Sequence, residues 1–173
     1  KQKTAYEIPK RDWSSDVCSS DLDPYVGLYR RGFIDTTTVV ARLDAIRAVG
    51  GFDASLPNAQ DFELWLALLS APETRFLVFP EVLSRYHRTA GSVMTHIDRR
   101  RRCCMTIAQR YAPALRSRPG SPVVSLWFRT LAVHAEALAS HREKRDWGQA
   151  VMTALALAGN LIRATATYLT GSV

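Results

Sequence analysis

The sequence has few cysteines and no long hydrophobic run. It contains three cysteines, of which only the adjacent pair Cys103 and Cys104 lies beyond residue 22. Neighbouring cysteines seldom bridge each other and lack the spacing of a zinc site, so a reducing, cytoplasmic location is expected. The longest run of apolar and small residues, Ala154 to Gly159, is far shorter than the roughly 20 residues of a spanning helix. The sequence therefore predicts neither a disulfide framework nor a transmembrane segment.

Acidic residues are too few to balance the basic ones, and the formal net charge is +7. Such a balance suits nucleic acid, an anionic membrane surface or phosphorylated substrates. The cluster Arg99 to Arg102 lacks interleaved aromatic residues and a recognised nucleic-acid-binding fold, which argues against a nucleic-acid partner. We expect a solvated helix here, or a peripheral contact with anionic lipid headgroups at the inner face of the cell membrane.

The first 22 residues offer no pattern that a core could bury. Lys1 to Ile8 and Arg11 to Leu22 resemble the in-frame translation of the two adapter pieces of a short-read sequencing library, separated by the length of a sample index. No continuous apolar stretch of a signal peptide is present. We therefore expect residues 1–22 to be a translated adapter artefact, with the native chain starting near Asp23, inside a gene.

Residues 23–95 have a mixed pattern that predicts an α/β fragment. Phe33 to Arg42 is rich in β-branched residues and predicts a strand, and Leu43 to Gly51 predicts a short helix closed by glycine. Pro57 to Ser70 predicts a helix with Asn58 as its N-cap. Two short strands broken at Pro80 are expected next. The apolar residues that the helix should bury, including the indole of Trp65, recur at helical spacing: Phe62, Trp65, Leu66 and Leu69.

Residues 96–173 predict helices, so a domain boundary is drawn near residue 95. A helix from His96 to Ala112 is followed by a linker rich in proline and glycine. Two further helices, Val123 to Ser140 and Val151 to Leu169, should form a helical hairpin. Each should bury its apolar stripe on the other or on the domain. The two stripes are Val124, Trp127, Phe128, Leu131, Ala135 and Leu138, and Val151, Leu155, Ala158, Ile162, Thr165 and Leu169.

An ordered set of motifs lies between residues 30 and 95. A Thr/Val run at Thr36 to Val40 is followed by a short helix, the turn Gly-Gly-Phe-Asp at Gly50 to Asp53, and Gln60-Asp61 before Glu63-Leu64-Trp65-Leu66. This order resembles the carboxy-terminal half of the catalytic domain in family 2 glycosyltransferases of the GT-A fold. The resemblance implies inverting, non-processive transfer of a sugar from a nucleotide-diphosphate donor to a glycan or lipid-linked acceptor, with bacterial cell-surface polysaccharide as the product class.

The resemblance implies that Asp61 is the catalytic base that takes the proton of the acceptor hydroxyl. The family's Glu before this Asp is replaced by Gln60, which removes a neighbouring negative charge. An alternative stays open, because a carboxylate in the first turn of a helix also satisfies backbone donors and the helix dipole.

Three further residues are candidates for substrate binding. His87 and Arg88 lie where related enzymes place a loop near the donor phosphates, and a guanidinium there could pair with the diphosphate. The family's histidine three residues after the Tyr is Thr89 here, so a solvated arginine and a strand-end histidine remain the alternative. Asp53 either faces the acceptor or caps its own turn, and the cap is favoured.

The resemblance also implies a divalent cation, Mg²⁺ or Mn²⁺, that neutralises the leaving diphosphate. The family's Asp-x-Asp motif and its βαβ nucleotide-binding half are absent from residues 23–173, so the main metal ligands should be missing and this chain alone should be inactive. A rival interpretation is a non-enzymatic helical interaction module, in which residues 96–173 are the functional part.

Overall fold

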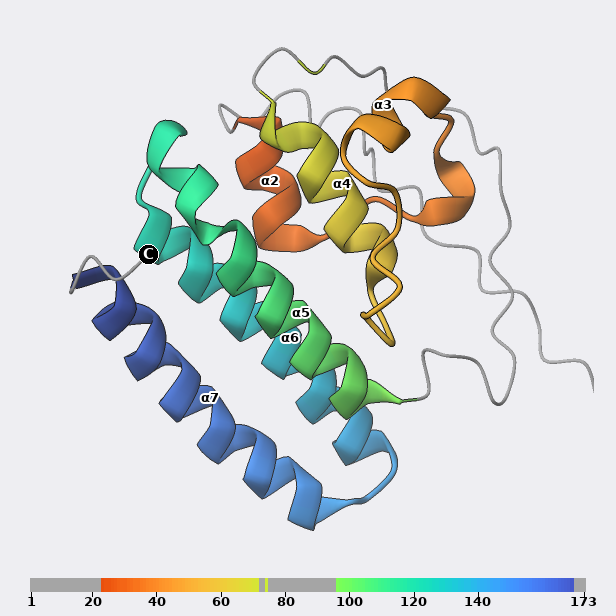
Figure 1. Ribbon diagram of the computed structural model, residues 1–173. Coiled ribbons are helices and arrows are strands. Elements are labelled where there is room, and N and C mark those ends of the chain that lie inside the picture. Colours follow the sequence, from red (N-terminus) through yellow and green to blue (C-terminus); the bar gives the residue numbers. More distant parts are fainter. Residues whose placement is uncertain (1–22, 72–73, 75–95, 170–173) are drawn as a thin grey trace, which may run out of the picture.

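The computed structural model describes residues 23–71, 74 and 96–169, and every regular element in these residues is a helix (Figure 1). The predicted α/β class, as a portion of a GT-A domain, is wrong for this part of the chain, because no strand occurs in it. In order, the elements are α2 (Pro24–Arg31), η1 (Thr36–Thr38), α3 (Leu43–Ala48), α4 (Gln60–Ser70), α5 (Ile97–Tyr111), η3 (Ala112–Ser117), α6 (Pro122–Glu143) and α7 (Trp147–Leu169).

The predicted strand from Phe33 to Arg42 is instead an extended segment interrupted by the 3₁₀ turn η1. Asp35 and Val39 on either side of the turn have extended backbone angles, and the Thr38 hydroxyl donates to the Asp35 carbonyl at 2.7 Å. A β-branched run forms a strand only where a neighbouring strand completes its hydrogen bonds. The described residues supply no such neighbour. The two strands expected around Pro80 lie outside the described residues.

Helix α2 has strong local signals at both ends, although the sequence analysis did not predict it. The Asp23 carboxylate accepts from the backbone N–H groups of Tyr25 and Val26 at 2.9 and 3.2 Å. Pro24 occupies the first turn, and Gly32 ends the helix in the left-handed region at φ 59°. This combination of an aspartate cap, an early proline and a terminal glycine is a common helix frame.

The helix-stop role of Gly50 and Gly51 is confirmed, with φ angles of 89° and 73° directly after α3. Helix α4 starts later than predicted. Asn58 is not the N-cap, because the chain reaches the helix through Ala59 at φ 61°. Asp61 therefore occupies the second helical position.

The hydrophobic core is shared by helices from both sides of residue 95. The predicted inward face of α4 is confirmed, and Trp65 is 6% exposed. Two tyrosine hydroxyls tie α2 to the end of α5: Tyr25 donates to the Tyr111 carbonyl at 2.9 Å and Tyr29 to the Ala108 carbonyl at 2.6 Å. Further members of the core are Leu28, Phe62, Leu64, Leu66, Cys104, Ile107, Leu126 and Val133.

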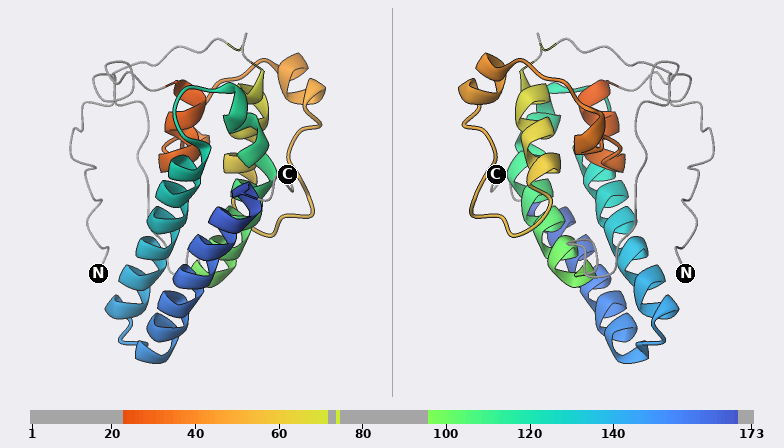
Figure 2. Two further views of the ribbon diagram at one scale, coloured as in Figure 1. Left: turned by 90° about the vertical axis from the view of Figure 1, so that its left-hand side faces the viewer. Right: turned by 90° about the vertical axis from the view of Figure 1, so that its right-hand side faces the viewer.

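The predicted helical hairpin is confirmed: α6 and α7 run antiparallel, side by side (Figures 1 and 2). Ser121 caps α6 by accepting from Val124 N–H at 3.4 Å. The hairpin turn uses Arg145 at φ 57°, and Asp146 accepts from Gln149 N–H at 3.1 Å at the start of α7. No helix in the described part of the chain is both long enough and apolar enough to cross a membrane.

The faces that the hairpin buries differ from the prediction. Large members of both predicted stripes are exposed, for example Phe128 and Leu155. Helix α6 instead turns inward a set that includes polar side chains, and α7 buries Thr153 and Ala164. The buried residues of α6 are Ser125, Leu126, Arg129, Thr130, Val133, His134, Ala137 and His141.

Candidate functional site

Asp61 lies in the first turn of α4, half-buried and hydrogen-bonded by polar groups. Its Oδ2 accepts from the hydroxyl of Thr36 in η1 at 2.7 Å, and its Oδ1 accepts from the backbone N–H of Phe62 at 2.8 Å. Thr36 is exposed, so this side of the carboxylate faces solvent. The carboxylate therefore caps the helix start and also accepts a hydrogen bond from an alcohol group.

Arg100 in α5 brings a positive charge to the same region. Burial disfavours the charge on this guanidinium, but the carboxylates of Glu136 and Asp61, together with Cys104, outweigh that effect and raise the pKa of Arg100. The Arg100 Nε lies 3.2 Å from Glu136 Oε1. Asp61 is thus a carboxylate within electrostatic reach of a cation that is anchored to α6.

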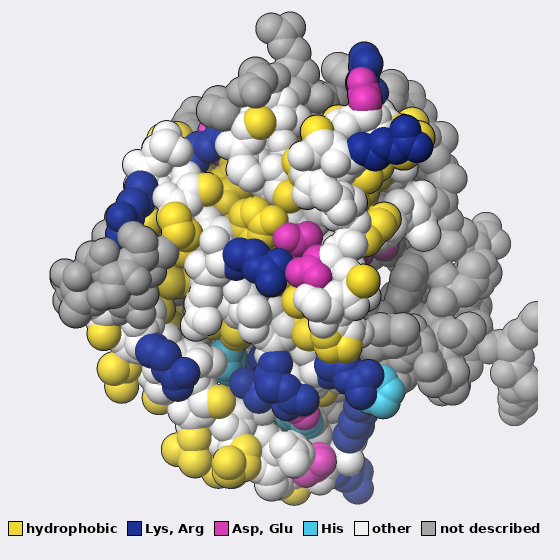
Figure 3. All heavy atoms as spheres, viewed as in Figure 1, with side chains coloured by type: hydrophobic (Ala, Val, Ile, Leu, Met, Phe, Trp, Pro, Cys, Tyr) yellow, Lys and Arg dark blue, Asp and Glu magenta, His cyan; other side chains and the backbone are white. Residues whose placement is uncertain are grey.

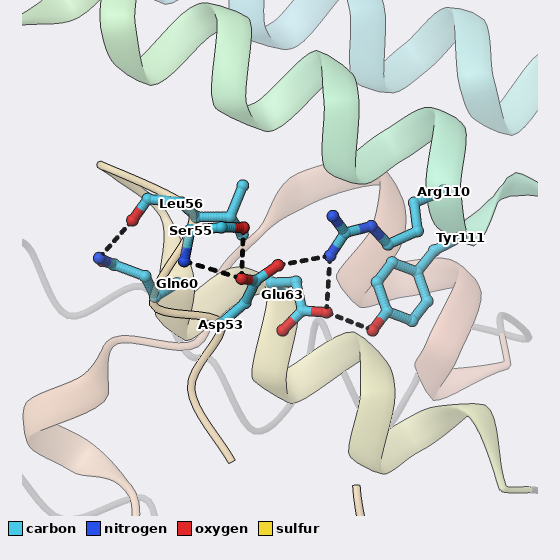
Figure 4. A network of polar contacts seen from close by, with 7 residues as sticks. All are labelled: Asp53, Ser55, Leu56, Gln60, Glu63, Arg110 and Tyr111. Carbon is cyan, nitrogen blue, oxygen red and sulfur yellow. Dashed lines mark hydrogen bonds and ion pairs between the residues drawn. The ribbon is translucent and has the colours of Figure 1, made fainter. Parts of the chain in front are cut away.

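A second cluster of charged groups connects the turn after α3, helix α4 and the end of α5 (Figure 4). Arg110 Nη1 lies 2.8 Å from Asp53 Oδ2 and 3.3 Å from Glu63 Oε1. The hydroxyl of Tyr111 donates to Glu63 Oε1 at 2.6 Å. In the same view, Gln60 donates to the Leu56 carbonyl at 2.6 Å, so this amide fixes the approach to α4.

Asp53 caps its own turn, which confirms the structural role favoured from sequence. Its Oδ1 accepts from the backbone N–H and the hydroxyl of Ser55 at 2.9 and 2.5 Å. These hydrogen bonds, followed by the one from Arg110, lower the pKa of Asp53 to about 2. The carboxylate thus accepts hydrogen bonds from Ser55 and Arg110, and a role in substrate binding stays a prediction.

Glu63 is the most enclosed acid of this cluster, at 7% exposure. Burial, followed by the hydrogen bond to Glu63, raises the pKa of Tyr111 above its usual value, so the phenol stays protonated and donates. Asp53 is the one member of this ionic cluster that the sequence marked as a site residue. No local spacing in the sequence predicts the contacts among Glu63, Arg110 and Tyr111, because these contacts join positions 47 and 48 residues apart.

His87 and Arg88 lie outside the described residues. In the part of the chain that the structure describes, no group of three or more His, Cys, Asp or Glu side chains could hold a metal ion. The described residues therefore do not fit the expected divalent cation.

The comparisons with known proteins identify no relative. No family model matches the chain, and neither a curated protein nor a solved structure is similar to it.

Proposed function

We propose that Asp61 is the general base of an inverting, non-processive transfer of a sugar from a nucleotide-diphosphate donor to an acceptor hydroxyl. The observation that carries the proposal is the Thr36 hydroxyl 2.7 Å from Asp61 Oδ2, at the position that the Gly-Gly-Phe-Asp and Leu-Trp-Leu motifs mark in sequence. A carboxylate that already accepts a hydrogen bond from an alcohol on its exposed side has the geometry of a base.

In the proposed reaction, the acceptor hydroxyl takes the place of the Thr36 hydroxyl at Asp61 Oδ2. Asp61 removes the proton while the acceptor oxygen attacks the anomeric carbon, and the bond to the nucleoside diphosphate breaks on the opposite face. The bond between Phe62 N–H and Asp61 Oδ1 holds the carboxylate in one orientation. Arg100 keeps a positive charge near the base.

The chain alone should not turn over substrate, because the expected donor-binding half and the ligands of the Mg²⁺ or Mn²⁺ ion are not among its recognisable motifs. The second candidate function is the non-enzymatic helical interaction module. It is favoured by one observation, the exposed apolar side chains of α6 and α7.

The test uses residues 23–173 joined to the upstream reading frame of their gene. Asp61→Asn should lower kcat by about 10²- to 10⁴-fold, the usual contribution of a positioned general base. Donor binding, measured by calorimetry with the nucleotide sugar, should stay near that of the parent. The matched control is Asp44→Asn, because Asp44 is an exposed aspartate whose ion pair with Arg42, at 2.8 Å, is also exposed.

Transfer by the Asp61→Asn protein at the parent rate would remove the proposed role of Asp61. The interaction module would be favoured by two results together. The joined protein would transfer sugar from no nucleotide donor, and a binding activity would still require α6 and α7.

A further inference from the structure

The helical hairpin carries a large exposed apolar surface, which we call the hairpin face. Its members on α7 are 59 to 71% exposed, and those on α6 are 42 to 54% exposed. On the surface of a soluble protein, exposed apolar side chains are usually scattered singly, whereas a contiguous patch of this kind marks a contact site. The hairpin face consists of Val124, Trp127, Phe128 and Leu131 on α6 and Trp147, Val151, Leu155 and Ile162 on α7.

The two halves of the hairpin face lie on the same side of the hairpin. On α7, Val151, Leu155 and Ile162 recur four and seven residues apart, on the side of the helix opposite to the buried Thr153 and Ala164. The indole N–H of Trp127 on α6 donates to the Thr165 hydroxyl on α7 at 3.2 Å. Trp127 therefore bridges the helices on the exposed side and makes the two stripes continuous.

One end of the hairpin is cationic. The start of α5 is held next to the end of α6 by Asp98 Oδ2, 3.4 Å from His141 Nε2, and by Arg100, 3.2 Å from Glu136. Five exposed basic residues lie in these two segments and the turn that follows α6, against three exposed acids, Glu136, Glu143 and Asp146. The five are Arg99, Arg102, Arg142, Lys144 and Arg145.

Figure 3 shows the two features next to each other, with hydrophobic side chains gathered along α7 at the lower left and Lys and Arg side chains across the lower part of the molecule. Trp147, at the start of α7, directly follows the basic turn in sequence. Tryptophan and arginine are common at a boundary between apolar and charged surroundings, because each has an apolar body and a polar tip.

Most acids in the described residues are committed to internal partners. Six of them form ion pairs within the chain: Asp23, Asp44, Asp53, Glu63, Asp98 and Glu136. The described residues of a second copy thus offer few acids outside ion pairs to match the cationic end. An anionic lipid surface satisfies both features at once, because it takes up apolar side chains and attracts basic ones.

We propose that the hairpin face and its cationic end bind the surface of an anionic lipid bilayer, with α7 lying along the plane of the membrane. The apolar side chains of α7 and Trp127 enter the boundary between headgroups and acyl chains. Arg99, Arg102 and Arg142 meet the phosphates. Arg100 and Arg101 take no part, since they are turned toward Glu136 and Asp98. This binding is independent of the proposed catalytic role of Asp61.

The test is flotation of the 173-residue chain with vesicles of phosphatidylcholine, with and without phosphatidylglycerol. We expect the chain to bind the vesicles that contain phosphatidylglycerol. Binding should fall by about tenfold or more when the salt concentration is raised or the anionic lipid is left out. The double variant Leu155→Ser with Ile162→Ser should lose binding by about tenfold or more, because it removes apolar surface from the inserting face. Arg99→Gln with Arg102→Gln should weaken binding only to the anionic vesicles.

The matched control is Val40→Ser with Leu43→Ser, since these two apolar residues are 102 and 58% exposed and lie far from α7 in sequence. This variant and Asp61→Asn should bind vesicles like the parent chain, and circular dichroism should show unchanged helix content in all variants. Absence of vesicle binding, or equal binding by the Leu155 and Ile162 variant, would overturn the proposal. A dimer in sedimentation equilibrium that dissociates in this variant, without vesicle binding, would assign the hairpin face to a second copy.

Discussion

The guanidinium carbon of Arg129 lies 4.0 Å from the centre of the Phe62 ring, and this contact joins α6 to α4 inside the core. Arg129 is 5% exposed, and burial lowers its pKa. The same guanidinium occupies the space next to Gly32 at the end of α2, where an added Cβ would lie 2.6 Å from Nη1. A buried cation on an aromatic ring thus depends on a glycine in a different helix.

Gly32→Ala should destabilise the protein by about 1 to 3 kcal/mol, because it adds a left-handed non-glycine residue at φ 59° and displaces Arg129. Gly159→Ala is the matched control with the opposite sign. No atom lies within 4 Å of a Cβ there and the residue is in the middle of α7, so a gain of about 0.5 to 1 kcal/mol is expected. Urea unfolding followed by circular dichroism measures both. Equal effects of the two substitutions would contradict the placement of Arg129.

Tyr111→Phe should cost about 1 to 3 kcal/mol of unfolding free energy, because it leaves the buried Glu63 carboxylate without its 2.6 Å hydroxyl donor. The comparison is Tyr25→Phe, which removes a donor to a neutral carbonyl and should cost only about 0.5 to 1.5 kcal/mol. Denaturant titration of the two variants directly gives the order of their losses in unfolding free energy. A smaller cost for Tyr111→Phe would show that Glu63 does not depend on this hydrogen bond.

We expect the ionised carboxylate of Asp53 to make an acid-sensitive contribution to the stability of the protein. Hydrogen bonds from Ser55, followed by that from Arg110, lower its folded-state pKa to about 2, below the value of about 3.9 in an unfolded chain. The unfolded state therefore binds the proton first, and the stabilisation present above about pH 4 is lost as the pH falls toward 2. Asp53→Asn should remove this part of the acid dependence. Parallel stability curves for the parent and Asp53→Asn between pH 2 and 5 would refute the assignment.

His134 predicts a second pH dependence, in the range below neutrality. The ring is 0% exposed, its Nδ1 bonds to the Thr130 carbonyl at 2.8 Å, and its Nε2 lies near Arg101 and Asn160. Burial, together with the Arg101 charge, lowers the pKa of His134, although the bond to Thr130 opposes the shift. The neutral ring with a proton on Nδ1 accepts from both neighbours at Nε2.

Because the unfolded chain binds a proton on this histidine at about pH 6.5 and the folded chain at a lower pH, stability should fall as the pH drops below about 6.5. His134→Gln should reduce the slope of stability against pH between about 7 and 5. The measurement is urea unfolding at several pH values, and NMR titration of the ring in the folded protein gives the shift itself. A ring that titrates above 6.5 would reverse the predicted sign.

Local sequence patterns identified the helices of the second half and the stop after α3. Gly50 and Gly51 end a helix because they accept positive φ without strain, and Phe62 and Trp65 are buried as their spacing indicated. The same kind of reasoning could have found α2, whose Asp23, Pro24 and Gly32 are local signals. The candidate base was also visible in sequence, because Asp61 belongs to an ordered set of motifs.

The predicted strand at Phe33 to Arg42 failed for a physical reason. β-branched residues favour an extended backbone, and the extended angles of Asp35 and Val39 agree with that preference, but a strand also needs a partner that no local pattern supplies. The capping error at α4 is similar, because the left-handed Ala59 is held by the surrounding turn against its own preference.

The sequence by itself determined where the helices of the hairpin lie and how they are joined, because periodicity, proline, glycine and capping residues act over a few positions. The tertiary structure decided which face each helix buries. Helix α7 has apolar residues on nearly every side, so its own pattern does not decide which face is buried. Helix α6 packs against α5 and α2 with His134 and Arg129 turned inward, and this packing selected the small and polar residues for the interior. Leu155 and Ile162 were left on the outside, and contacts as distant as Arg110 with Asp53 arose only when the helices came together.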